Sequence, residues 1–271
     1  MQNISQIEQY STSTDLGYSF YGGSAPLLVF VHGVLDRGRS FLRIKSRLTN
    51  QAVLLYDRRG YGDSPIIDNL IQSNINTIQL ALKDLEILLG GHQTILIGHS
   101  FGAVVSLKAS LEIKNVLGCV IYEPPLSWLS WWVSPLATAG QITQNTRPTE
   151  AVEMFMINSL GQARWTKLSD KIKKDLYSRG EILIKELTDL RKEAPFDVDK
   201  ITAPMVLACG SESSTRQKRG IEYLSEHILN SKTVEILGAK HNAHMTHYKD
   251  FANLIESSVN YIFDWSQFNA D

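Results

Sequence analysis

The sequence predicts an α/β fold in which a mostly parallel, eight-stranded sheet is flanked by helices and interrupted by a helical cap insertion. Short apolar runs alternate along the chain with longer segments of helical period, as in parallel sheets covered by helices on both faces. One interval, from Pro124 to about Ile201, has no strand-like run and is patterned for helices instead. The chain has 271 residues, of which 43% are hydrophobic and 20% charged, which is typical of a globular protein.

Eight segments carry the strand pattern. Residues 5–12 and 16–21 alternate apolar and polar side chains around a turn signal at Thr14 and Asp15, which predicts an antiparallel hairpin at an edge of the sheet. Six apolar runs are predicted to be buried strands, and they span residues 27–32, 52–57, 94–99, 119–123, 205–210 and 233–237.

The segments between these strands favour helices, because their apolar side chains recur every three or four residues. Those predicted to pack on the sheet span residues 39–49, 74–89, 101–113, 216–229 and 247–263. Three more, at residues 149–160, 164–177 and 179–192, fall in the insertion. We therefore expect a core domain of residues 1–125 and 201–271 and a helical cap, or lid, of residues 126–200.

Composition narrows the choice of partner and compartment. Twenty-seven Lys and Arg residues against 28 Asp and Glu give a formal charge of −1, which does not favour nucleic acid or an anionic membrane as a partner. Cys119 and Cys209 lie in apolar runs, where reduced thiols behave as buried hydrophobic groups. The first residues lack a signal-peptide pattern, and no run approaches the roughly 18 apolar residues of a membrane span. We expect a cytoplasmic protein that acts on a small molecule; its oligomeric state is unknown.

The motif GHSFG, residues 98–102, follows an apolar strand directly and precedes a helical pattern. A strand that turns sharply into a helix holds the central residue in a strained backbone conformation, and the flanking glycines prevent clashes. The turn exposes Ser100 at the carboxyl edge of the sheet, close to the N–H groups that begin the helix. This context favours a nucleophilic serine over a plain Gly-Ser turn.

A serine hydroxyl needs a base to become a nucleophile near neutral pH. His241 follows the last predicted strand and Gly238, which brings it to the same sheet edge as Ser100. The rival, His244, is expected to be a packing or lining residue. Together with His247 these histidines recur every three residues, so they rotate around a helix, and no obvious carboxylate or thiolate completes the set. The sequence therefore predicts no metal site and no cofactor.

An oxyanion hole is predicted at the same edge. His32 and Gly33 end the strand at residues 27–32, and the backbone N–H groups of Val34 and Phe101 are the expected donors. Such donors hold the negative charge that develops on the tetrahedral intermediate of acyl transfer.

Taken in chain order, the elements HG at residues 32–33, DRRGYGDS at 57–64 and GHSFG at 98–102, the helical insertion and the late histidine resemble the α/β-hydrolase superfamily, of the type with a serine nucleophile and a cap. The resemblance covers nearly the whole chain. It implies an α/β-hydrolase fold and a catalytic triad without a cofactor. The DRRGYGDS segment resembles a turn common in these proteins, and we interpret it as a structural loop rather than a source of catalytic aspartates.

The triad acid departs from the usual pattern. Many family members place an aspartate after the seventh strand, where this chain has Glu212 in the segment CGSESS. Others place the acid at the end of the sixth strand, where Glu123 is followed by two prolines that make the chain rigid. We favour Glu123 and keep Glu212 as the alternative. An ion pair with a lysine or arginine of the cap is the structural interpretation of either glutamate, and a site without an effective acid is the third possibility.

The serine nucleophile argues against dehalogenases and epoxide hydrolases of this superfamily, which use an aspartate. We expect a serine esterase that cleaves an ester, thioester or lactone. The same triad also serves lyases, C–C bond hydrolases and acyltransferases, and a ligand-binding or sensing protein with little turnover is the alternative from another class.

The start of the predicted cap is dense in apolar residues. Trp128, Trp131 and Trp132 are expected to line the pocket of a small to medium-sized apolar substrate. The competing interpretations are a segment that only anchors the cap and a membrane-docking patch, although few cationic residues interleave the tryptophans.

Overall fold

The computed structural model describes residues 6–8, 12–67, 69–132 and 142–268. By its contacts the chain divides into two compact units. The first comprises residues 1–65, 81–125 and 196–271, and the second comprises residues 66–80 and 126–195. The segment at residues 66–80 thus groups with the insertion, while the division into a hydrolase core and a cap at residues 126 and 200 stays a prediction.

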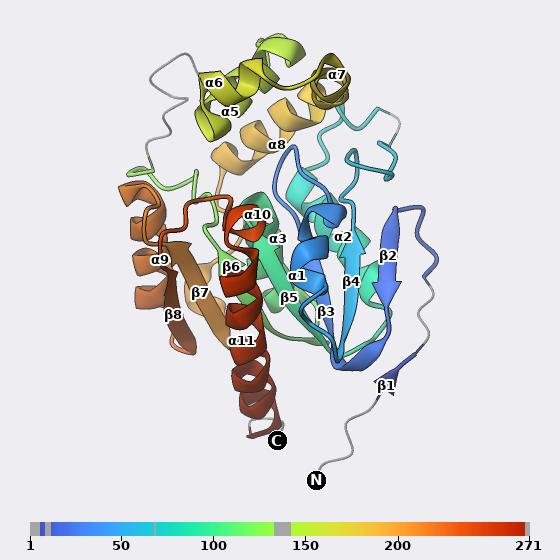
Figure 1. Cartoon of the computed structure of the whole chain (residues 1–271), viewed down its shortest axis with the longest axis vertical. Coiled ribbons are helices and arrows are strands. Elements are labelled where there is room, and N and C mark those ends of the chain that lie inside the picture. Colours follow the sequence, from blue (N-terminus) through green and yellow to red (C-terminus); the bar gives the residue numbers. More distant parts are fainter. Residues whose placement is uncertain (1–5, 9–11, 68, 133–141, 269–271) are drawn as a thin grey trace. The chain divides into compact units, whose positions relative to one another are not determined.

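The first unit is built on an eight-stranded sheet (Figure 1). Its strands are β1 (Gln6–Ile7), β2 (Tyr18–Tyr21), β3 (Gly23–Val31), β4 (Gln51–Tyr56), β5 (Thr94–His99), β6 (Val116–Tyr122), β7 (Met205–Gly210) and β8 (Ser231–Ile236). The order is β2-β4-β3-β5-β6-β7-β8, and β1 pairs with β3. The pairs from β4 and β3 through to β8 are parallel, so the predicted fold class is confirmed.

The predicted N-terminal hairpin is wrong. β1 pairs antiparallel with the start of β3, through Gln6 and Ser24, whereas β2 pairs antiparallel with β4, through Tyr18 and Tyr56. The alternation of polar and apolar residues marked two half-exposed strands, but it does not encode their partners. Each strand adds to a different neighbour in the sheet.

Helices cover both faces of this sheet. The helices are α1 (Leu42–Lys45), α2 (Thr77–Leu89), α3 (Phe101–Glu112), α9 (Thr215–His227), α10 (Ala243–Thr246) and α11 (Tyr248–Phe268), with short 3₁₀ turns η1 (Gly38–Phe41) and η2 (Val198–Lys200). All belong to the first unit except the first turn of α2, which is part of the second. The predicted helix at residues 39–49 is thus split between η1 and α1, and α10 was not predicted.

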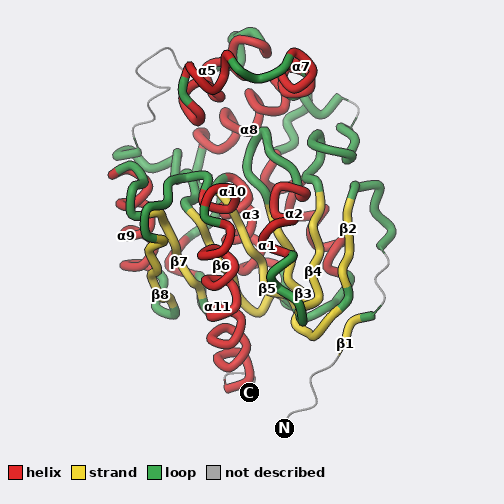
Figure 2. The backbone as a smooth tube through the Cα atoms, viewed as in Figure 1, coloured by secondary structure: helices red, strands yellow, loops and turns green. Residues whose placement is uncertain are grey.

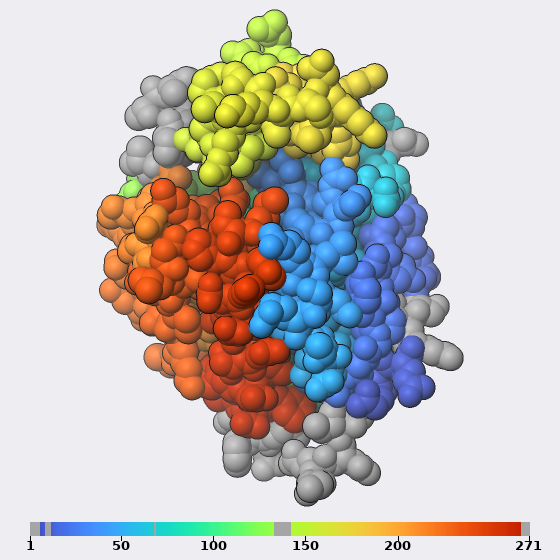
Figure 3. Space-filling model, viewed as in Figure 1, coloured from blue at the N-terminus to red at the C-terminus, as the bar shows by residue number. Residues whose placement is uncertain are grey.

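One large apolar core lies between the sheet and the helices α1 and α11. Fully buried side chains of the central strands, such as Phe30 and Ile97, join Ile44 of α1 and Phe251 of α11 in one cluster. The two helices pack side by side, and their surfaces meet in Figure 3, while Figure 2 shows them in front of the strands. Because side chains alternate along a strand, the opposite face of β5 remains for α3.

The second unit contains the helical insertion between β6 and β7. Its helices are α5 (Pro148–Leu160), α6 (Gln162–Thr166), α7 (Asp170–Tyr177) and α8 (Gly180–Lys192). The predicted helix at residues 164–177 is interrupted because Ser169 caps a new helix, its side chain accepting from the N–H of Ile172. No helix in the described part of the chain is long and apolar enough to cross a membrane.

Candidate active site

Ser100 lies at a sharp turn between β5 and α3. Its backbone has φ of 54° and ψ of −124°, a conformation that non-glycine residues rarely adopt. A Cβ atom on Gly98 would lie 2.5 Å from Cα of Ala103, and one on Gly102 would lie 2.0 Å from the carbonyl oxygen of Val31. Both glycines of the motif are therefore required where the helix doubles back against the sheet.

Glu123 is the first residue after β6 and contacts His241. Its carboxylate oxygen Oε2 lies 2.7 Å from Nδ1 of His241. The other oxygen accepts from the backbone N–H of Gly210 at 2.9 Å and from the hydroxyl of Ser213. Glu123 is only 1% exposed, so these donors offset the cost of removing a carboxylate from water.

Glu212 does not take this place. Its side chain is 58% exposed, and its carboxylate lies 3.8 Å from Nζ of Lys240 in a surface ion pair. The structure therefore brings the favoured candidate, and not its alternative, into contact with His241.

Two hydrogen bonds hold the loop that carries His241. The hydroxyl of Tyr122 donates to the carbonyl of Lys240 at 3.0 Å, and Nε2 of His99 lies 2.8 Å from the carbonyl of His241. Burial, followed by the charges of His244 and His241, lowers the pKa of His99 well below its usual value, so its ring is neutral. Because its Nε2–H donates to this carbonyl, the residue beside Ser100 is tied directly to the histidine loop.

Sequence reasoning missed Gln217, whose Nε2 lies 2.8 Å from Nδ1 of His241. This ring nitrogen cannot both donate to Glu123 and accept from Gln217. The carboxylate is the stronger partner, so Nδ1–H donates to Glu123. The side-chain amide of Gln217 therefore lies next to the ring without accepting or donating this hydrogen bond. The signal in the sequence was the capping box at the start of α9, in which Ser214 and Gln217 bond to each other.

The loop after β3 lies against the nucleophile. A Cβ atom on Gly33 would be 3.4 Å from Oγ of Ser100, and the predicted oxyanion donors Val34 and Phe101 are the residues that follow Gly33 and Ser100. The backbone carbonyl of Gly33 accepts from Nδ1 of His32 at 2.7 Å and from Arg58 at 3.0 Å. These bonds fix the orientation of the Gly33 carbonyl.

Arg58 is a second residue that sequence reasoning missed. It is buried, and its Nε donates to the carbonyl of His32 at 2.8 Å, while its backbone N–H donates to Nε2 of the same histidine at 2.8 Å. The guanidinium also lies 4.7 Å from the ring centre of Phe101. One side chain thus contacts both segments predicted to supply the oxyanion hole. Its position in the DRRGYGDS turn was the available signal.

The carboxylate of Asp57, in the same turn, accepts hydrogen bonds from backbone N–H groups. One carboxylate oxygen accepts from the N–H of Gly38 at 2.7 Å, and the other accepts from the N–H of Asp63 at 2.9 Å. Gly62 has a positive φ of 54° and leaves no room for a Cβ atom beside this carboxylate. The turn therefore joins β4 to the start of η1.

The tryptophans named as substrate-binding candidates belong to the second unit. Trp132 is buried, Trp128 and Trp131 are half-buried, and the rings of Trp131 and Trp132 lie 5.9 Å apart. The apolar segment continues from Val133 into residues that lie outside the described part of the chain. A role in substrate binding stays a prediction.

The sheet order, the strained serine after β5 and the contact of His241 with the buried Glu123 are those of an α/β hydrolase. Residues 28–254 match the profile of the Alpha/beta hydrolase family, and the chain belongs to this family.

Individual relatives are distant. The monoglyceride lipase homolog of Monkeypox virus is 22% identical over 240 residues, covering 80% of this chain and 82% of that protein. Lipase LipV of Mycobacterium tuberculosis is 30% identical over 116 residues, so the alignment spans 42% of this chain and less than half, 43%, of LipV. A solved thermophilic esterase from Thermogutta terrifontis is 16% identical, with a TM-score of 0.69 over 95% of this chain and 99% of that chain. The similarity to the esterase structure shows that the two chains share a fold.

Proposed function

We propose that the protein is a serine hydrolase that cleaves an ester, thioester or lactone of a small to medium-sized apolar substrate through an acyl-enzyme on Ser100. The observation that carries this proposal is the 2.7 Å contact between Nδ1 of His241 and the buried carboxylate of Glu123, in a fold that also holds Ser100 in a strained backbone conformation. Nucleophile, base and acid all come from the carboxyl ends of neighbouring strands or from the loop after the last one.

Acylation begins when Oγ of Ser100 attacks the substrate carbonyl carbon and its proton passes to Nε2 of His241. Glu123 accepts the Nδ1–H bond, fixes the tautomer and stabilises the imidazolium that forms. The tetrahedral oxyanion is held by the N–H groups of Val34 and Phe101. When the intermediate collapses, His241 returns the proton to the leaving group, and the acyl group remains on Ser100.

Deacylation repeats these steps with water as the nucleophile. His241 takes a proton from water, the second tetrahedral intermediate uses the same two N–H groups, and the proton returns to Oγ as the carboxylic acid leaves. No redox or metal step is needed for this balance.

The proposed substrate class rests on two supports. The relatives are described as lipases or as an esterase. The apolar segment with Trp128, Trp131 and Trp132 favours an apolar acyl or alcohol group over a sugar. The ligand-binding alternative rested on an uncertain acid, and the Glu123–His241 contact supports the hydrolase instead.

Labelling with a fluorophosphonate, followed by intact mass measurement, tests the nucleophile without a chosen substrate. We expect one adduct per wild-type chain and none on Ser100→Ala. A folded wild type that resists the probe as fully as the alanine variant would rule out an activated serine. Turnover of acetyl, butyryl and octanoyl esters in ¹⁸O-water then identifies the reaction, because a hydrolase places the label in the released acid, whereas an acyltransferase delivers the acyl group to an added alcohol.

A further inference from the structure

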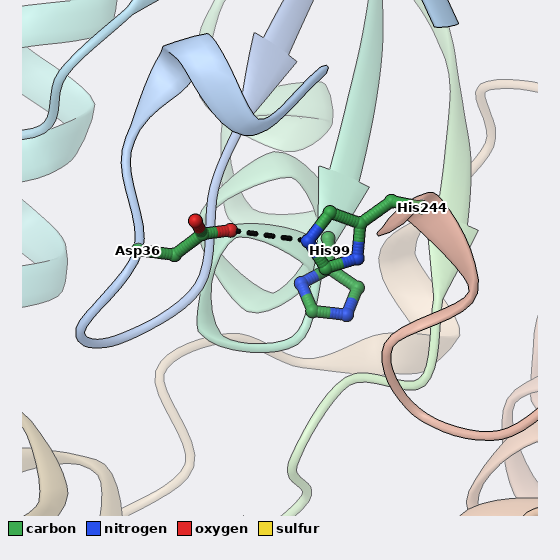
Figure 4. Close-up of side chains that lie close together, drawn as sticks. All are labelled: Asp36, His99 and His244. Atoms are coloured by element: carbon green, nitrogen blue, oxygen red, sulfur yellow. Dashed lines mark ion pairs between the residues drawn. The ribbon is translucent and has the colours of Figure 1, made fainter. Parts of the chain in front are cut away.

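Three side chains from three separate segments of the chain converge beside the nucleophile turn (Figure 4). Asp36 lies two residues after Val34, His99 ends β5, and His244 belongs to α10. One ligand atom from each lies within 4.8 Å of the others, and Oδ2 of Asp36 is 3.3 Å from Nε2 of His244. All three residues belong to the first compact unit.

The two imidazoles of this cluster are buried with unused nitrogens. His99 is 4% exposed and His244 is 2% exposed. Within the described part of the chain, Nδ1 of His99 and Nδ1 of His244 have no hydrogen-bond partner, whereas Nε2 of His244 faces only the Asp36 carboxylate. Leaving such groups buried without a partner costs about 1–3 kcal/mol each, so their retention calls for a ligand.

Hydrogen bonds with neighbouring groups fix the tautomer of His99 and orient the carboxylate of Asp36. Because Nε2–H of His99 donates to the carbonyl of His241 at 2.8 Å, its Nδ1 carries a free lone pair. The hydroxyl of Ser40 lies 3.1 Å from Oδ2 of Asp36 and 2.9 Å from the carbonyl of Arg37, and its proton is shared between these two acceptors. Hydrogen bonds of this kind, from the far side of a ligand, fix the tautomer and direction of metal-binding groups.

We propose that Asp36, His99 and His244 form a binding site for one divalent transition-metal ion of the zinc class. Two imidazoles and one carboxylate are ligands that zinc accepts, and two ligands of a tetrahedral zinc ion lie about 3.3 Å apart, as Asp36 and His244 do. A shift of roughly 1.5 Å, from the 4.8 Å limit to about 3.3 Å, brings the third ligand into the same sphere. One cation would thereby satisfy a nitrogen on each histidine.

The geometry of the site also suggests how an ion enters and what it does. The Asp36 side chain is 21% exposed, which gives the ion a route from solvent. An ion bound there would cross-link three segments: the loop after β3 that carries Asp36, the turn that carries Ser100, and α10, which follows the loop with His241. The histidine trio considered from the sequence alone is a different set, since Nδ1 of His241 is bonded to Glu123.

Zinc titration of untagged, chelator-treated protein, followed by calorimetry, tests the site independently of any activity. We expect one zinc ion per chain and a rise in the melting temperature when it binds. Asp36→Asn and His244→Gln should each weaken binding by more than about tenfold. His247→Gln, which alters a neighbouring histidine outside the cluster, should retain the wild-type affinity.

Location is tested on the wild type, so that a variant that fails to fold does not obscure the result. Anomalous scattering at the zinc edge from soaked crystals should place the ion between Asp36, His99 and His244. An ion located elsewhere, no stoichiometric binding, or unchanged affinity in both folded variants would overturn the proposal.

Discussion

At the residue scale, backbone strain is concentrated at the proposed active site. Of the four described non-glycine residues with positive φ, three lie there, namely Leu35 in the loop predicted to supply an oxyanion donor, Ser100 and Glu123. Each such residue costs on the order of 1–3 kcal/mol unless its surroundings enforce it. The N–H of Ser100 donates to Tyr122 at 2.9 Å and that of Glu123 donates to Ala208 at 3.2 Å, which continues the sheet ladder through both strained residues.

Replacing the carboxylate of Glu123 should reveal its role. Glu123→Gln keeps the side-chain shape but removes the charge that stabilises the imidazolium, so we expect kcat to fall by about 10³- to 10⁴-fold with little change in KM. Steady-state kinetics on a turned-over ester, with circular dichroism to check folding, measures this. Glu212→Gln is the matched control and should stay within about twofold of wild type; a larger loss in Glu212→Gln than in Glu123→Gln would reverse the assignment.

At the scale of elements, buried charged side chains join segments that are distant in sequence. Arg58, after β4, reaches the loop after β3 and the ring that begins α3. Within the second unit, Asp189 of α8 accepts from the N–H of Thr77 at the start of α2, at 3.0 Å. Each contact fixes where a helix or loop begins relative to its neighbours.

Arg58→Lys should weaken the oxyanion loop because an ammonium cannot reproduce the forked contacts to His32 and Gly33. We expect kcat to fall about tenfold or more, approaching the loss seen when an oxyanion donor is removed. The rate of fluorophosphonate labelling checks the same effect without a substrate. Arg39→Lys, on an exposed arginine of η1, provides the control, and equal rates in the two variants would contradict a bracing role.

Asp189→Asn should destabilise the protein. The carboxylate is 3% exposed and pairs with Lys192 at 3.0 Å and with Lys185 at 3.6 Å, and the side chain of Lys185 is itself buried. Removing the charge leaves a buried ammonium without its counter-ion, at a cost of about 3 kcal/mol. Urea unfolding measures the loss. Asp197→Asn, which breaks the exposed pair with Lys200, should change the free energy of unfolding by less than about 1 kcal/mol.

At the scale of the whole molecule, sheet order and register assemble the site. His99 pairs with Tyr122, and Tyr122 pairs with Ala208, so Ser100 and Glu123 leave adjacent strands at the same level. The loop with His241 follows β8, and the oxyanion loop follows β3 on the other side of β5. Ligand sites of α/β sheets lie at this carboxyl edge for the same reason.

The burial of His99 makes the stability of the whole fold depend on pH. The pKa of His99 in the folded chain lies well below the ordinary histidine value of 6.5, so below that pH the unfolded chain binds a proton that the folded chain excludes. Stability from this residue is therefore present above pH 6.5 and is lost as the pH falls, by up to about 1.4 kcal/mol per pH unit. Urea unfolding with a chelator between pH 7.5 and 5.5 should show this slope, and His99→Gln should reduce it; an unchanged slope would contradict the assignment.

Local patterns in the sequence determined most of the elements and part of the candidate site. The apolar runs that became β5 and β7 were predicted with their observed bounds, because a buried strand between turn signals has a distinct pattern. GHSFG gave Ser100 from a single stretch of chain, since the strain and both close glycine contacts arise within that turn. His241 could be predicted as the base from its position after the last strand alone.

Tertiary structure alone decided which distant groups meet. The choice of Glu123 over Glu212, the brace from Arg58, the amide of Gln217 and the separate partners of β1 and β2 all depend on strand order and on loop conformations that no local period encodes. The cluster of Asp36, His99 and His244 has the same origin, because its members come from a loop, a strand end and a helix that only the assembled sheet brings together. Sequence periodicity reports how each segment is buried, whereas contacts between loops are set by the packing of the whole sheet.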